Sequence, residues 1–82
     1  MKGKVMEQTS TQIWQHVRSG ERYVVEVDFS GTVIGAAGPL YHMDIAAARH
    51  GDYTSDTDLV LDIDGTQDDY RLIEPQERIR TL

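Results

Sequence analysis

The residues best suited to chemistry in this sequence are aspartates, and they are concentrated in one short segment. Seven of them fall within positions 52–69, a stretch without lysine or arginine: Asp52, Asp56, Asp58, Asp62, Asp64, Asp68 and Asp69. Carboxylates at this density can hold a cation, transfer protons or attract a basic protein surface. Because they repel phosphate groups, we expect no direct binding of nucleic acid.

One pair of these aspartates belongs to a motif. The residues Leu59-Val60-Leu61-Asp62-Ile63-Asp64-Gly65-Thr66 form an apolar run that ends in Asp-x-Asp-Gly-Thr. This run resembles the first motif of haloacid-dehalogenase-type phosphatases. The resemblance implies Asp62 as nucleophile, Asp64 as general acid/base and a magnesium ion held by both. The family also needs a lysine downstream, whereas the only lysines here, Lys2 and Lys4, lie upstream. A magnesium-dependent phosphohydrolase is therefore our second alternative, and Asp64-Gly65 is interpreted as a turn signal.

The spacing of the acidic residues and histidines does not favour a calcium or a zinc site. A calcium loop that began at Asp62 would have Gln67 in place of the turn glycine and Ile73 in place of the final glutamate. The three histidines, His16, His42 and His50, fall on two different predicted helices, which does not favour a zinc site. We expect no metal, no cofactor and no catalytic residue, so the protein is predicted not to be an enzyme.

Length and composition narrow the class of protein. The 82 residues suit one small domain rather than a two-domain enzyme, and 39% hydrophobic residues can form one layered core. The absence of cysteine excludes disulfides and thiolate metal sites, and no apolar run is as long as a membrane span. We therefore expect a cytoplasmic protein that does not associate with membranes.

The net charge of −6 is unevenly placed along the chain. Residues 1–41 contain four basic and four acidic residues, whereas residues 42–82 contain four basic and ten acidic residues. The whole excess of negative charge therefore lies in the second half. Such a segment either keeps the protein soluble or forms a contact surface for a basic partner.

The start of the chain predicts a short helix. Thr9 with Gln12 fits a capping box, and Ile13, Trp14 and Val17 fall on one helical face before a glycine ends the segment. In this interpretation Trp14 anchors the helix on a sheet.

Residues 23–37 predict a β-hairpin. Apolar residues alternate from 23 to 29, Ser30-Gly31 supplies a two-residue turn, and residues 32–37 return as the partner strand. The facing pairs in this register are Phe29 with Thr32, Val27 with Ile34, Val25 with Ala36, and Glu26 with Gly35, where the glycine leaves an opening without side-chain bulk.

The remaining residues predict a second helix and a second hairpin. Gly38-Pro39 is expected to end the strand, residues 40–50 to form a helix and residues 52–58 a polar loop. Residues 59–63 and 70–74 alternate as strands do, and a hairpin between them places Asp62 opposite Arg71 as an ion pair.

These elements together predict a small single α+β domain over residues 1–82, ordered helix–hairpin–helix–hairpin, with an antiparallel sheet of about four strands. A small SH3-like open barrel is the alternative, and residues 1–8 and 76–82 are expected to be loosely ordered termini. The predicted function is that of a small non-enzymatic interaction or regulatory protein that binds a protein partner or a second copy of itself. The first alternative is an acidic mimic of nucleic acid that inhibits a basic protein. The predicted contact surface consists of Asp56, Asp58, Asp64, Asp68 and Asp69.

Overall fold

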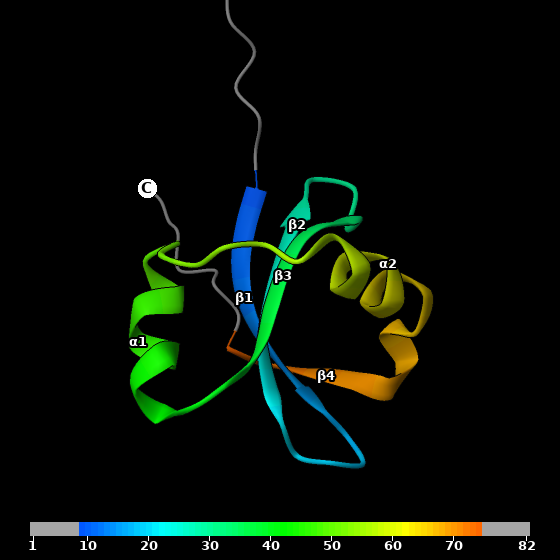
Figure 1. Cartoon of the computed structure of the whole chain (residues 1–82). Helices are drawn as coiled ribbons and strands as arrows, with labels where there is room; N and C mark the ends of the chain where they lie inside the picture. Colours follow the sequence, from blue (N-terminus) through cyan, green and yellow to red (C-terminus); the bar gives the residue numbers. More distant parts are fainter. Residues whose placement is uncertain (1–8, 75–82) are drawn as a thin grey trace, which may run out of the picture.

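The computed structural model describes residues 9–74, which form four β-strands, two α-helices and one short 3-10 helix (Figure 1). Along the chain these are β1 (Thr9–His16), β2 (Arg22–Asp28), β3 (Val33–Leu40), α1 (His42–Arg49), α2 (Thr57–Gly65), the 3-10 helix η1 (Gln67–Asp69) and β4 (Tyr70–Glu74). The expectations for residues 1–8 and 76–82 lie outside the described residues.

The strands form one antiparallel sheet in the order β3-β2-β1-β4. The predicted α+β class and four-stranded antiparallel sheet are therefore confirmed. Within residues 9–74 the sheet stays open, with β3 and β4 as its two edges, so the alternative of a small barrel is wrong.

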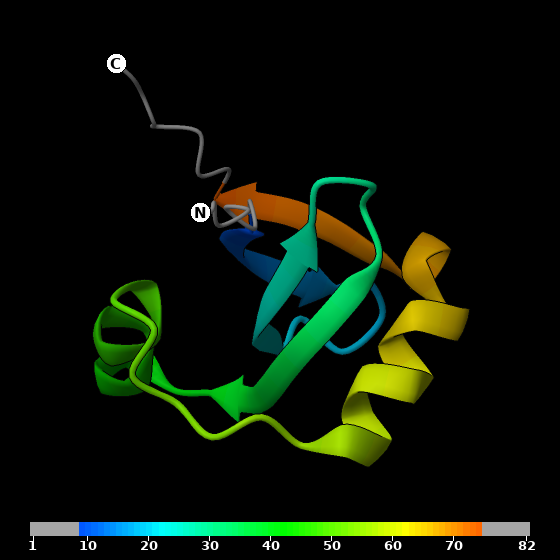
Figure 2. The same cartoon turned by 90° about the horizontal axis from the view of Figure 1, so that it is seen from above.

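The two helices cover opposite faces of this sheet (Figure 2). On one face Ile63 of α2 packs with Val25 and Val27 of β2, and on the other face Ala48 of α1 packs with Val24 of β2. Because neighbouring residues of a strand point to opposite faces, β2 contributes to both apolar clusters and forms the centre of the core.

The predicted first helix is wrong, since residues 9–16 form β1. The side chain of Ile13 is buried on the α1 side, while Trp14 packs against the cluster on the α2 side, as alternation in a strand requires. β1 is a central strand, paired with β2 on one side and β4 on the other. Thr9, Thr11 and Ile13 are β-branched residues, which suit a strand in this position.

The hairpin of β2 and β3 is confirmed, with one change of register. Val25 pairs with Ala36 and Glu26 with Gly35 as predicted, but an irregularity follows Glu26, so Val27 pairs with Val33 instead of Ile34. Phe29 lies in the turn with 86% of its surface exposed, which corrects its predicted inward position opposite Thr32.

The chain does not leave the sheet at Gly38-Pro39, as predicted, because β3 continues to Leu40. Proline is tolerated there since β3 is an edge strand, where one missing N–H breaks no ladder bond. The second predicted helix is confirmed as α1, starting at His42.

The predicted strand at residues 59–63 is wrong, since these residues lie in α2. Leu59, Val60 and Ile63 pack toward the sheet at helical spacing, whereas Leu61 is 68% exposed. The hairpin with residues 70–74 is consequently absent, and β4 pairs with β1. The predicted ion pair between Asp62 and Arg71 does not form, because the Arg71 guanidinium donates from Nε and Nη2 to Gln15 Oε1, at 3.3 and 3.1 Å.

In the described part of the chain we find no helix with the length and apolar character that crossing a membrane requires.

Candidate functional site

The five predicted contact aspartates all lie on α2, at its ends or on η1, and all are exposed. Asp56 is the residue that caps α2, Asp58 and Asp64 lie within the helix, and Asp68 and Asp69 belong to η1. The segment lies between the loop that follows α1 and the start of β4, on the right of Figure 1. The structure thus places these side chains along two successive helices, α2 and η1, which Thr66 separates, instead of on a polar loop and a hairpin.

Two of the five hold the local fold. The Asp56 carboxylate accepts hydrogen bonds from the backbone N–H groups of Asp58 and Leu59, at 3.0 and 3.3 Å, which is the geometry of an N-cap. Asp64 Oδ1 accepts from Gln67 Nε2 at 3.1 Å and from the backbone N–H of Val33 at 3.5 Å. Both carboxylates therefore have structural tasks.

On α2 and η1 four exposed aspartates have no side-chain hydrogen bond within residues 9–74, and together with Leu61 we call them the acidic face: Asp58, Asp62, Asp68 and Asp69. The spacing of three and four residues from Asp58 places Leu61 and Asp62 beside it on the outer side of α2. Burial raises the pKa of Tyr70, and the negative charges of Asp62 on α2 and Asp69 on η1 add to this, so both carboxylates lie near the Tyr70 hydroxyl. Asp62 belongs to this surface because the predicted pairing with Arg71 does not form.

The phosphatase-like motif does not have the geometry that its chemistry would need. The mechanism implied by the resemblance presents both carboxylates from the end of a strand toward one cation. In the structure Asp62 and Asp64 lie on a helix, two residues and therefore about 200° apart, and Asp64 bonds to Gln67. The two carboxylates point to different sides of α2.

No group of three His, Asp or Glu side chains in residues 9–74 lies together so as to hold a metal ion. His16 lies on β1, while His42 is the first residue of α1 and His50 is its C-cap. The predicted placement of two histidines on one helix is confirmed for His42 and His50 and wrong for His16.

An aromatic cluster lies where β1, β2 and β4 meet on the α2 side of the sheet. The Tyr70 ring is 6.2 Å from that of Trp14, 5.7 Å from that of Tyr23 and 5.0 Å from that of His16, measured between centroids. Burial and Glu21, which accepts a hydrogen bond from the Tyr23 hydroxyl, raise the pKa of Tyr23 to about 12. Trp14 thus anchors β1 to the core, whereas the sequence had suggested an anchor for a helix.

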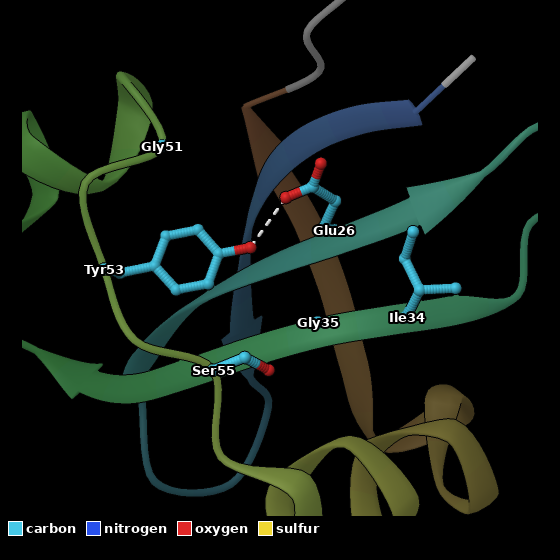
Figure 3. Close-up of a pocket in the computed structure, with 6 residues that line it drawn as sticks. All are labelled: Glu26, Ile34, Gly35, Gly51, Tyr53 and Ser55. Atoms are coloured by element: carbon cyan, nitrogen blue, oxygen red, sulfur yellow. Dashed lines mark hydrogen bonds between the residues drawn. The ribbon is translucent and has the colours of Figure 1, made fainter. Parts of the chain in front are cut away.

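A hollow of about 340 Å³ opens on the other face of the sheet (Figure 3). Its lining residues come from the β2–β3 pair and from the loop between the helices: Glu26, Ile34, Gly35, Gly51, Tyr53 and Ser55. The opening predicted beside Glu26 and Gly35 is therefore present. The contributions of Tyr53 and Ser55 were not predicted, because residues 52–58 were interpreted only as a polar loop.

Hydrogen bonds fix the walls of this hollow. The Tyr53 hydroxyl donates to Glu26 Oε1 at 2.7 Å, as Figure 3 shows, and the Thr9 hydroxyl donates to the other oxygen of Glu26 at 2.9 Å. Ser55 Oγ accepts from the backbone N–H of Ala36 at 3.1 Å, and the Asp56 N–H donates to the Ala36 carbonyl at 2.8 Å. These two bonds tie the loop along the free edge of β3 and protect it from pairing with another strand.

Tyr53 is held in its neutral form. Burial raises the pKa of its phenol above the ordinary value, and both the hydrogen bond to Glu26 and the negative charge of Glu26 add to this. The hydroxyl is therefore a permanent donor to the carboxylate at neutral pH.

A comparison of the chain with protein-family models, curated proteins and solved structures finds no match.

Proposed function

We propose that this protein acts without catalysis, by binding a protein partner with a basic surface, and that the acidic face forms the centre of that contact. The observation that supports the proposal is the exposed Leu61 between Asp58 and Asp62 on the outer side of α2. A soluble helix normally exposes polar residues opposite its buried side, so a leucine that is 68% exposed there is an unused apolar contact.

The charges around Leu61 define the chemistry of the partner. No lysine or arginine lies between Arg49 and Arg71, so the negative potential of α2 and η1 is not neutralised within this stretch of sequence. Complementary charge raises the rate of association and selects a basic surface, while the apolar side chain slows dissociation. An apolar centre with a charged rim is the usual anatomy of a protein interface.

Affinity capture with matched variants of the full chain tests this proposal. The double variant Asp58→Asn/Asp62→Asn removes two charges from the acidic face, and Leu61→Ser removes its apolar contact. The control Asp44→Asn/Asp52→Asn also removes two exposed charges, but from α1 and the loop that follows it. We expect one stoichiometric partner that the wild type and the control retain, that higher salt releases, and that both acidic-face variants lose.

Equal capture of the same partner by all four proteins would refute the proposed surface. If the captured protein binds nucleic acid and this chain displaces that nucleic acid in a competition assay, the result would support the alternative in which the aspartates mimic phosphate groups.

A further inference from the structure

The Glu26 carboxylate at the end of the hollow is held by neutral groups. The side chain is half-buried, and within residues 9–74 it accepts two hydrogen bonds, from the hydroxyls of Tyr53 and Thr9. Neither donor carries a positive charge, so neither of these two groups neutralises the carboxylate in its partly buried site. Each of its oxygens also keeps a second acceptor position.

The rest of the hollow is shaped for a narrow apolar group. Ile34, which is 48% exposed, and the Tyr53 ring form apolar walls, and the backbone of Gly35 forms the floor (Figure 3). A Cβ atom at position 35 would lie 3.1 Å from the Tyr53 hydroxyl and 3.6 Å from Ser55 Oγ, so any side chain there would fill the space. A volume of about 340 Å³ is at the lower end for ligand sites, which suits one short chain of carbon atoms.

We propose that this hollow binds an alkylammonium group, either of a small free amine or of a lysine side chain. The ammonium would lie against Glu26 and donate to the carboxylate, while the alkyl chain would lie along Ile34 and the Tyr53 ring. An anion is repelled by Glu26.

This site is separate from the acidic face. Glu26 lies between Val25 and Val27, which pack with α2, so its side chain points to the opposite face of the sheet. The proposal therefore does not depend on the proposed partner surface, and either can fail while the other holds.

Titrations of the full chain, followed by amide chemical shifts in NMR at constant ionic strength, test the site. n-Butylammonium is the probe, and n-butanol is the neutral molecule of matched shape. We expect saturable shifts at Gly35, Gly51 and Ser55 with the ammonium and none that saturate with the alcohol. Glu26→Gln should weaken binding by about tenfold or more, because it removes the charge that the ammonium contacts. The matched control Glu21→Gln changes a second carboxylate that accepts from a tyrosine hydroxyl within residues 9–74 and should leave binding unchanged.

A second pair of variants keeps the test valid if Glu26→Gln does not fold. Gly35→Ala should abolish binding because its methyl group fills the floor, whereas Gly65→Ala on α2, where a Cβ atom meets nothing within 4 Å, should bind as the wild type does. N-acetyl-lysine N-methylamide separates the two sources of the ligand. Binding at least as tight as that of butylammonium identifies a lysine side chain as the ligand, and binding of butylammonium alone identifies a free amine. Equal shifts with butanol, or unchanged affinity in both Glu26→Gln and Gly35→Ala, would overturn the proposal.

Discussion

Replacing Ile63 and Leu61 separately by alanine tests whether residues 57–65 form a helix that packs by one side. In an alternating strand, residues 61 and 63 share a face, and the two substitutions would cost about the same free energy of unfolding. On α2 they lie about 200° apart, and the structure buries Ile63 completely while Leu61 is 68% exposed. The two interpretations therefore predict different ratios of the two costs.

The magnitudes follow from burial. Ile63→Ala removes three carbon atoms from a fully buried site, or about 2.4 kcal/mol of transfer free energy at about 0.8 kcal/mol each. The cavity left among Val25, Val27 and Val33 adds to this, for a total of about 3 to 4 kcal/mol. Leu61→Ala loses only the buried third of a similar transfer term, or about 0.8 kcal/mol, and the better helix propensity of alanine offsets a few tenths of it.

Equilibrium urea denaturation of both variants, followed by circular dichroism, measures these costs. We expect the free energy of unfolding to fall by about 3 to 4 kcal/mol for Ile63→Ala and by less than about 0.7 kcal/mol for Leu61→Ala, with similar slopes. Equal losses for the two variants would refute the helical packing of α2. Because Leu61 is also the proposed partner contact, its small effect on stability would make Leu61→Ser a clean probe of binding.

Three further outcomes are expected from urea denaturation. Asp56→Ala should lower the free energy of unfolding by about 1 kcal/mol, because it removes the N-cap of α2. Asp58→Ala should change it by less than about 0.5 kcal/mol, and equal effects of the two variants would contradict the capping role of Asp56. Gly38→Ala should lower the free energy of unfolding by about 3 kcal/mol or more, since at φ +149 its Cβ atom would lie 2.5 Å from the Tyr23 ring. Gly51→Ala, at φ +80 with nothing within 4 Å of its Cβ atom, should lower it by about 1 kcal/mol, and similar losses for the two variants would exclude the clash. Tyr53→Phe should lower the free energy of unfolding by about 1 kcal/mol at pH 8. Because folding raises the pKa of this phenol, the difference in stability between wild type and variant should shrink as the pH rises above 10, and a difference that stays constant would contradict the buried neutral donor.

The central hairpin could be predicted because local pattern and tertiary demand agree there. Residues 23–28 alternate in a way that only a strand accommodates, and β2 is buried on both faces between its neighbours. The pairing of Glu26 with Gly35 followed from the turn at Ser30-Gly31, so one part of the hollow could be predicted as well. The irregularity after Glu26 could not, because nothing in the sequence marks the extra residue.

Two segments have apolar patterns that fit both a helix and a strand, and for both the predicted element is wrong. In residues 59–63 the apolar positions suit a strand at 59, 61 and 63 and equally a helix at 59, 60 and 63. Asp56, which caps α2, was the signal for the helix, but the segment was interpreted as a polar loop. In residues 9–16 a plausible capping pair outweighed the β-branched residues, which are the better guide in a strand with partners on both sides.

The sequence by itself determined the α+β class, the antiparallel hairpin of β2 and β3, the apolar residues of β2 and the excess of aspartate in the second half. Only the tertiary structure decided which ambiguous segment became strand and which became helix. The physical reason is that β1 gains hydrogen bonds from two neighbouring strands, whereas residues 57–65 bury Ile63 by covering one face of the sheet. In the resulting fold Leu61 lies exposed among the aspartates, and the loop residue Tyr53 donates a hydrogen bond to the carboxylate of Glu26.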